Sequence, residues 1–176
     1  WHTATLLPDG SVLVAGGEDD DGAVGSAERY DPRTDSWHAA GALNEARFAH
    51  TATLLADGTV LVAGGETGTS DAAPLSSSEI YDPVADTWRV AGHLNARRAN
   101  HSATLLPDGT VIALGGHTAV VERYLPASGT WVADPAPIPP GGRAGDIVTA
   151  PLRDGTILAS TGDRAMRYLP GAAPAA

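Results

Sequence analysis

The chain has 176 residues, a formal net charge of −10 and no cysteine. The acidic surplus argues against binding nucleic acid or an anionic membrane through net charge, and no apolar run is near the eighteen residues that would predict membrane insertion. The missing cysteines exclude disulfides, thiolate metal sites and cysteine nucleophiles. With 21 glycines and 13 prolines, the composition favours many short elements over long helices, and the length favours a single domain.

The first predicted elements form two hairpins. Residues 3–7 and 11–17 are strand-like runs on either side of a Pro-Asp-Gly turn, in which glycine can take the left-handed conformation that completes a hairpin. The second hairpin has a strand that ends at Tyr30, a proline-containing turn and a strand that contains Trp37. This unit therefore predicts four short strands, which we name a, b, c and d.

The same unit recurs along the chain. Its Asp-Gly pairs begin at residues 9, 57, 108 and 154, so that the steps are 48, 51 and 46 residues. Such a period is typical of propeller blades. We interpret residues 1–176 as one unit of four repeats, which span approximately 1–46, 47–97, 98–142 and 143–176.

Two further features are shared by the first three repeats. Each repeat has a Gly-Gly pair after strand b, and a Tyr and a Trp seven residues apart, namely Tyr30/Trp37, Tyr81/Trp88 and Tyr124/Trp131. With these features the chain resembles the kelch repeat. The resemblance implies an all-β fold of the kelch-type β-propeller, in which each repeat is one four-stranded antiparallel blade.

The fourth repeat departs from this pattern. Thr161-Gly162 stands in place of the Gly-Gly pair, and no Trp follows Tyr168. We expect three complete four-stranded blades and an incomplete fourth. Because the sequence starts at Trp1 inside the pattern and a propeller needs closure, we expect a fragment of a larger ring. A half-ring that self-associates with a second copy is the alternative.

The loop lengths separate the two ends of the predicted blades. The a–b and c–d turns have constant lengths, whereas the distance from the second glycine to the tyrosine is 13, 16, 8 and 6 residues in the four repeats. Variable loops on a rigid scaffold are where binding usually resides, and the kelch resemblance implies partner binding at the same face. We therefore expect a ligand site on the b–c and d–a loops.

Candidate binding residues follow the Gly-Gly pairs or precede the a strands. They are Glu18, Arg47, Phe48, Glu66, Arg97, Arg98, Asn100, His117 and Arg143. Arginine side chains there are suited to carboxylates, and an aromatic ring to apolar groups. The arginines at 47, 98 and 143 share one repeat position, however, as do the glutamates at 28, 79 and 122. Structural ion pairing is the alternative role for these arginines, whereas Arg97 and Phe48 favour binding.

Two possible metal sites have simpler explanations. Residues 17–28 match several ligand positions of a calcium-binding loop, but glycine occupies the first position and strands flank the segment. We expect a solvated charged loop. His2, His50 and His101 share the first position of strand a, where the fourth repeat has Ile147. We expect hydrogen-bonding structural histidines there.

The predicted function is a non-catalytic module that binds a protein or a glycan and needs no cofactor. The alternative rests on similarity to the blades of galactose oxidase and related copper radical oxidases. It implies the propeller part of a secreted carbohydrate-active or oxidase-like enzyme whose catalytic residues lie outside this segment. The cross-linked Tyr-Cys cofactor of those oxidases requires a cysteine, which this chain lacks. The chain has arginine but no lysine, and it is rich in alanine. This composition favours a bacterial, exported protein.

Overall fold

The computed structural model describes residues 1–68, 74–135, 147–160 and 165–171. These residues form β-strands and no α-helix, which confirms the predicted all-β fold. None of the described segments is a helix of the length and apolarity that crossing a membrane requires.

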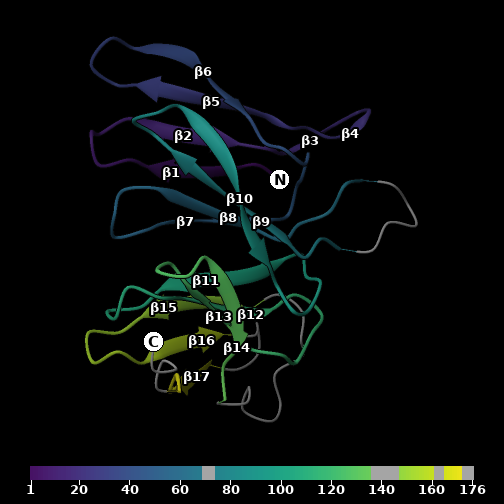
Figure 1. The fold of residues 1–176 in the computed structure, drawn as a ribbon, viewed down its shortest axis with the longest axis vertical. Coiled ribbons are helices and arrows are strands. Elements are labelled where there is room, and N and C mark those ends of the chain that lie inside the picture. Colours follow the sequence, from purple (N-terminus) through teal and green to yellow (C-terminus); the bar gives the residue numbers. More distant parts are fainter. Residues whose placement is uncertain (69–73, 136–146, 161–164, 172–176) are drawn as a thin grey trace.

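Three four-stranded antiparallel sheets and one three-stranded sheet succeed one another along the chain, and we call them blades 1 to 4 (Figure 1). Blade 1 consists of β1 (Thr3–Leu6), β2 (Val12–Ala15), β5 (Ser26–Asp31) and β6 (Ser36–Ala42). Blade 2 consists of β7 (Thr51–Leu54), β8 (Val60–Ala63), β9 (Ser77–Asp82) and β10 (Thr87–His93). Blade 3 consists of β11 (His101–Leu105), β12 (Val111–Gly115), β13 (Glu122–Leu125) and β14 (Thr130–Ala133). Blade 4 consists of β15 (Val148–Pro151), β16 (Ile157–Ser160) and β17 (Ala165–Tyr168). This is the expected kelch-type propeller architecture, with three complete blades and a fourth that has three strands within the described residues.

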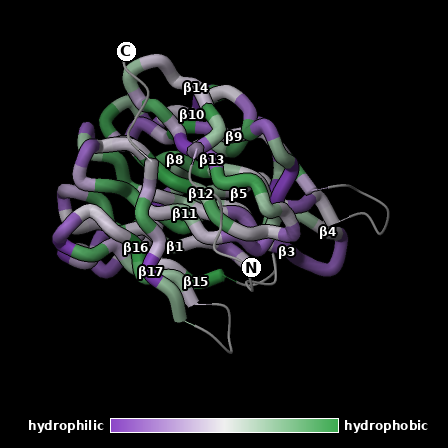
Figure 2. Tube along the Cα trace, turned by 90° about the horizontal axis from the view of Figure 1, so that it is seen from below, coloured by the Kyte–Doolittle hydropathy of each residue, from purple (hydrophilic) through white to green (hydrophobic). Residues whose placement is uncertain are grey.

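Each junction between blades is filled by an apolar cluster, because a blade buries both of its faces against its neighbours. Strand β8 shows this clearly, since all four of its residues are buried. Side chains alternate across a strand, so Val60 and Val62 pack toward blade 1, and Leu61 and Ala63 pack toward blade 3. Figure 2 shows hydrophobic stretches on the central strands and hydrophilic ones at the periphery.

The fixed spacing of Tyr and Trp has two structural consequences. Tyr81 and Trp88 face each other across β9 and β10, with ring centroids 5.1 Å apart. The indole nitrogen of Trp88 also donates a hydrogen bond to the carbonyl oxygen of Ala40 in blade 1 (3.1 Å). Trp131 repeats this contact by donating to the Ser78 hydroxyl of blade 2 (3.0 Å). The repeated tryptophan therefore joins its own blade to the preceding one.

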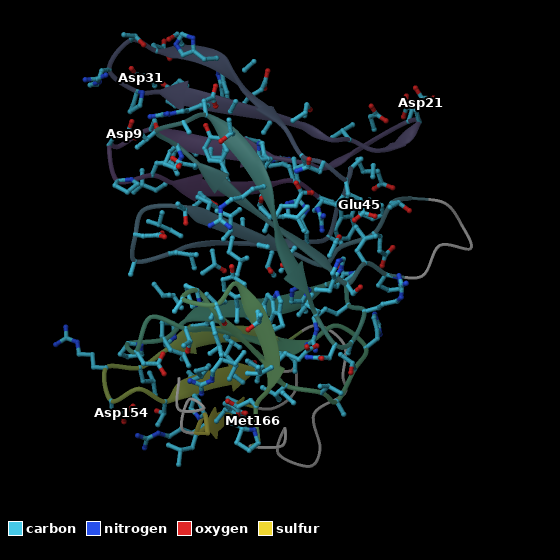
Figure 3. All side chains as sticks on the ribbon, viewed as in Figure 1. Asp9, Asp21, Asp31, Glu45, Asp154 and Met166 are labelled. Carbon is cyan, nitrogen blue, oxygen red and sulfur yellow. The ribbon has the colours of Figure 1, made fainter. Side chains whose placement is uncertain are left out.

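The turns and loops lie at opposite ends of the blades, as expected. In Figure 3, Asp9, Asp31 and Asp154 mark the end with the a–b and c–d turns, which we call the turn end. Asp21 and Glu45 mark the opposite end, with the b–c and d–a loops, which we call the loop face. The small hairpin of β3 (Glu18–Asp19) and β4 (Gly22–Ala23) belongs to the loop face.

Candidate functional site

The arginine at residue 47 lies inside the protein, beneath the d–a loop that connects blades 1 and 2. Its side chain is fully buried. One terminal nitrogen donates to the carbonyl oxygen of Gly64 (2.7 Å), and the other to a carboxylate oxygen of Glu79 (3.0 Å). Burial lowers the pKa of Arg47, while the nearby Glu79 charge opposes that shift. Arg47 is thus a structural group that fastens the loop to β8 and β9.

Glu79 also binds the backbone of the same loop. Its carboxylate accepts hydrogen bonds from the backbone nitrogens of Asn44 (2.8 Å) and Glu45 (3.0 Å), and from the Asn44 side-chain amide (2.7 Å). The buried Glu79 carboxylate therefore accepts hydrogen bonds from loop donors that would otherwise be left without a partner. The repeated Leu-Asn at 43–44 and 94–95 was a sequence signal for this interaction, although the sequence analysis did not use it.

Blade 3 contains the same arrangement. The fully buried Arg98 donates to Glu122 (2.6 Å), and Glu122 accepts hydrogen bonds from the backbone nitrogens of Asn95 (2.5 Å) and Ala96 (2.9 Å). Neither Arg47 nor Arg98 presents its guanidinium to solvent, so the assignment of these two arginines to partner binding is corrected. Structural pairing, the alternative drawn from their shared repeat position, is what the geometry shows.

The remaining candidates lie nearer the surface of the loop face. The side chains of Glu18, Arg97 and His117 are exposed, and those of Phe48, Glu66 and Asn100 are half-buried. Arg143 lies outside the described residues. The side chains that remain available at this face are therefore acidic, basic and aromatic, and they come from blades 1, 2 and 3.

Backbone contacts connect the loops of neighbouring blades. Phe48 and Glu66 exchange two backbone hydrogen bonds (3.0 and 2.9 Å), which place the d–a loop beside the segment that follows β8. The backbone nitrogen of Ala23, in the β3–β4 hairpin of blade 1, donates to the Thr67 carbonyl oxygen of blade 2 (3.4 Å). The acidic segment thus forms an exposed hairpin against the next blade. Nowhere in the described ranges do three or more potential metal ligands converge.

Two of the repeated histidines connect blades through hydrogen bonds. His50 Nε2 lies 3.0 Å from the Thr3 hydroxyl of blade 1, and His101 Nε2 lies 3.0 Å from the Thr51 hydroxyl of blade 2. Both rings are buried, and burial lowers the pKa of His50 to about 4 and that of His101 to about 3. The prediction of structural histidines is confirmed for this pair. His2, in contrast, is exposed.

The first strands of the four blades, β1, β7, β11 and β15, begin around an open cavity of about 310 Å³ at the centre of the loop face. All four blades contribute to its lining, which consists of Trp1, His2, Ala49, His50, Asn100, His101, Ile147 and Val148. Of the candidates that the structure describes, Asn100 alone lines this cavity. The exposed charged candidates lie outside its lining and belong to the surrounding loops.

Comparison with known proteins agrees with this architecture. Residues 2–44 and 47–95 match the family model of the Kelch motif, which covers more than half of the chain. The chain belongs to the kelch-repeat family. This kelch-repeat chain is similar to Kelch-like protein 26 of Mus musculus, with 32% identity over 126 residues, and to Kelch-like protein 34 of Homo sapiens, with 31% identity over 123 residues.

The similarity covers most of the kelch-repeat chain and a small part of each relative. The aligned segments include 69% and 68% of the chain, but only 20% and 18% of the relatives. The chain thus spans about a fifth of the length of the curated relatives it matches. Bacterial origin, export and likeness to galactose oxidase stay predictions.

Proposed function

We propose that the chain is a non-catalytic protein-interaction module that binds its partner through the loop face. The main support is the contrast between the buried and the exposed parts of the d–a loops. The buried Arg47–Glu79 and Arg98–Glu122 pairs hold the loop backbones in place. Side chains that differ between repeats are then displayed on a preorganised surface, which reduces the ordering cost of binding.

The exposed groups suit a protein partner. Arg97 is exposed, and among the described residues its guanidinium donates only to the Pro74 carbonyl oxygen (3.2 Å), so that further donors remain for a partner carboxylate. Glu18 and Glu66 offer acceptors for basic side chains, and the half-buried Phe48, which pairs with Glu66 through the backbone, adds an apolar group. Mixed charge around an aromatic group is typical of a protein interface with a polar rim.

Site-specific photo-crosslinking tests both the function and the face. A benzophenone amino acid replaces Asp20 in the β3–β4 hairpin of the loop face or, as the matched control, Ala127 at the turn end, since both side chains are exposed and neither belongs to the proposed contact. After irradiation in an extract of the source cells, we expect one saturable polypeptide adduct from position 20 and none from position 127. An Arg97→Glu variant of the unlabelled chain should compete at least about tenfold less well than the wild type, as expected for loss of a charge-assisted contact.

The possible outcomes separate the parts of the proposal. An adduct only from position 127 would overturn the choice of face. A carbohydrate adduct would replace a protein partner with a glycan. Equal competition by Arg97→Glu and by the wild type would remove Arg97 from the site, and the absence of a saturable adduct from position 20 would refute partner binding at the loop face.

A further inference from the structure

A groove of about 380 Å³ lies at the turn end, between blades 1 and 2, far from the loop face. Its apolar surface comes from Pro8 in the a–b turn of blade 1 and from Pro83 and Val84 in the c–d turn of blade 2. Val84 is 95% exposed, although nothing in the blade requires an apolar residue there. The groove therefore offers a preformed apolar contact that the fold itself does not use.

Arg29 forms the wall of this groove and makes it rigid. Its Nε donates to the Ser11 hydroxyl (2.7 Å), one terminal nitrogen donates to the Pro83 carbonyl oxygen of blade 2 (3.1 Å), and the other pairs with Asp9. The arginine thus fastens the two turns to each other across the blade junction. Because Asp9 forms an ion pair with it, the positive charge of Arg29 is compensated before any ligand arrives.

Carboxylates surround the apolar surface. Asp9, Asp57 and Asp82 line the groove, and an adjoining cavity of about 360 Å³ shares Asp9, Arg29, Pro83 and Val84 with it. Backbone hydrogen bonds from Ala85 and Val84 lower the pKa of Asp82, so that this group is ionised at neutral pH. Arg29 pairs with Asp9, which leaves Asp57 and Asp82 as a negative rim beside Val84.

The other blades do not reproduce this combination. At the turn position of Val84, blade 1 has Arg33 and blade 3 has Ala127. At the position of Arg29, blade 2 has Ile80, which is buried in the core between blades 2 and 3. Arg123 and Arg167 repeat the arginine and its aspartate pair in blades 3 and 4, so the difference lies in the apolar side chain at position 84. A smaller cavity of about 200 Å³ occupies the corresponding place between blades 3 and 4. The exposed apolar side chain of Val84 beside acidic residues is thus a property of the junction between blades 1 and 2, and the other repeats do not share it.

We propose that this groove is a second docking surface, and that it binds a short segment of a partner protein in which basic residues flank one large apolar side chain. The apolar side chain packs against Pro8, Pro83 and Val84. The flanking lysine or arginine side chains pair with Asp57 and Asp82. Such a segment is complementary to the groove, because its apolar side chain meets the apolar centre and its positive charges meet the negative rim. The surface lies at the end opposite the proposed loop-face site, so the two sites are independent.

Fluorescence anisotropy with a labelled peptide of sequence GKRLRKG tests the proposal on the intact chain at about 0.15 M ionic strength. We expect Val84→Arg to weaken binding by about tenfold or more, because it removes the apolar contact and adds a like charge. Ala127→Arg changes the net charge equally at the same turn position of blade 3, and should leave the affinity within about twofold. A GKRSRKG peptide should bind the wild type about tenfold less tightly, because serine lacks the apolar contact.

Several results would overturn the proposal. They are the absence of saturable binding of GKRLRKG to the wild type, equal losses for the Val84→Arg and Ala127→Arg variants, and equal affinity for the leucine and serine peptides. Arg97→Glu on the loop face should leave binding of this peptide unchanged. Tighter peptide binding in Arg97→Glu, with no loss in Val84→Arg, would instead place this basic peptide on the loop face, and would contradict the groove while leaving the proposed function intact.

Discussion

Acid should destabilise this fold through His50 and His101. The folded state holds both rings in their neutral form, with pKa values of about 4 and about 3, whereas an unfolded histidine has a pKa of about 6.5. A depressed folded-state pKa contributes stability that is present above the unfolded pKa and is lost as the pH falls toward the folded value. The affected window therefore begins near pH 6.5 and extends downward.

The size of the effect follows from the same pKa values. Each pH unit between the unfolded and folded pKa costs about 1.4 kcal/mol per histidine. Between about pH 7 and about pH 5, the free energy of unfolding should fall by about 2 kcal/mol for each ring and about 4 kcal/mol for both. Aspartates with lowered pKa values, such as Asp9 and Asp108, titrate below this window and do not mask the effect.

Urea unfolding at both pH values, followed by tryptophan fluorescence, measures this loss. The control is the double variant His50→Gln/His101→Gln, since glutamine keeps a hydrogen-bonding group toward Thr3 and Thr51 but does not titrate. Its free energy of unfolding should fall by less than about 1 kcal/mol over the same pH range. If the wild type and the double variant lose equal stability, the explanation through buried neutral histidines is refuted.

Two further perturbations test the framework of the blades by urea unfolding. Arg98→Met should destabilise the protein by about 3–5 kcal/mol, because it leaves the buried carboxylate of Glu122 without its partner. As the control, Arg33→Met at an exposed ion pair should leave the unfolding midpoint unchanged. Equal effects of the two substitutions would contradict the structural role of Arg98. Gly129→Asp should stabilise the protein by up to about 1 kcal/mol, because the buried Tyr124 hydroxyl has no hydrogen-bond partner within the described residues, whereas Asp86 accepts a hydrogen bond from the equivalent tyrosine of blade 2. Gly129→Ala, which has the same left-handed backbone (φ +67°) but no acceptor, should instead destabilise it; a gain from alanine as well would refute the hydrogen-bond explanation.

Much of the fold followed from local patterns. The Tyr, the proline-containing turn and the Trp predicted a hairpin, and β9 and β10 form one, with Tyr81 opposite Trp88. The Asp-Gly period predicted the blades, because turn residues and strand alternation are short-range properties that the repeat copies along the chain. The shared first position of His50 and His101 likewise indicated a structural role, since isoleucine fills the same position in the fourth repeat.

The sequence by itself thus determined the blades, their order and the end at which loop length varies. Only the tertiary structure decided which charged side chains reach a partner, because burial depends on residues that are distant in sequence. Arg47 and Arg97 have the same chemistry, but Arg47 is buried in an ion pair with Glu79, whereas Arg97 is exposed. The groove between Pro8 and Val84 likewise exists only because adjacent blades bring together turns that lie some 75 residues apart.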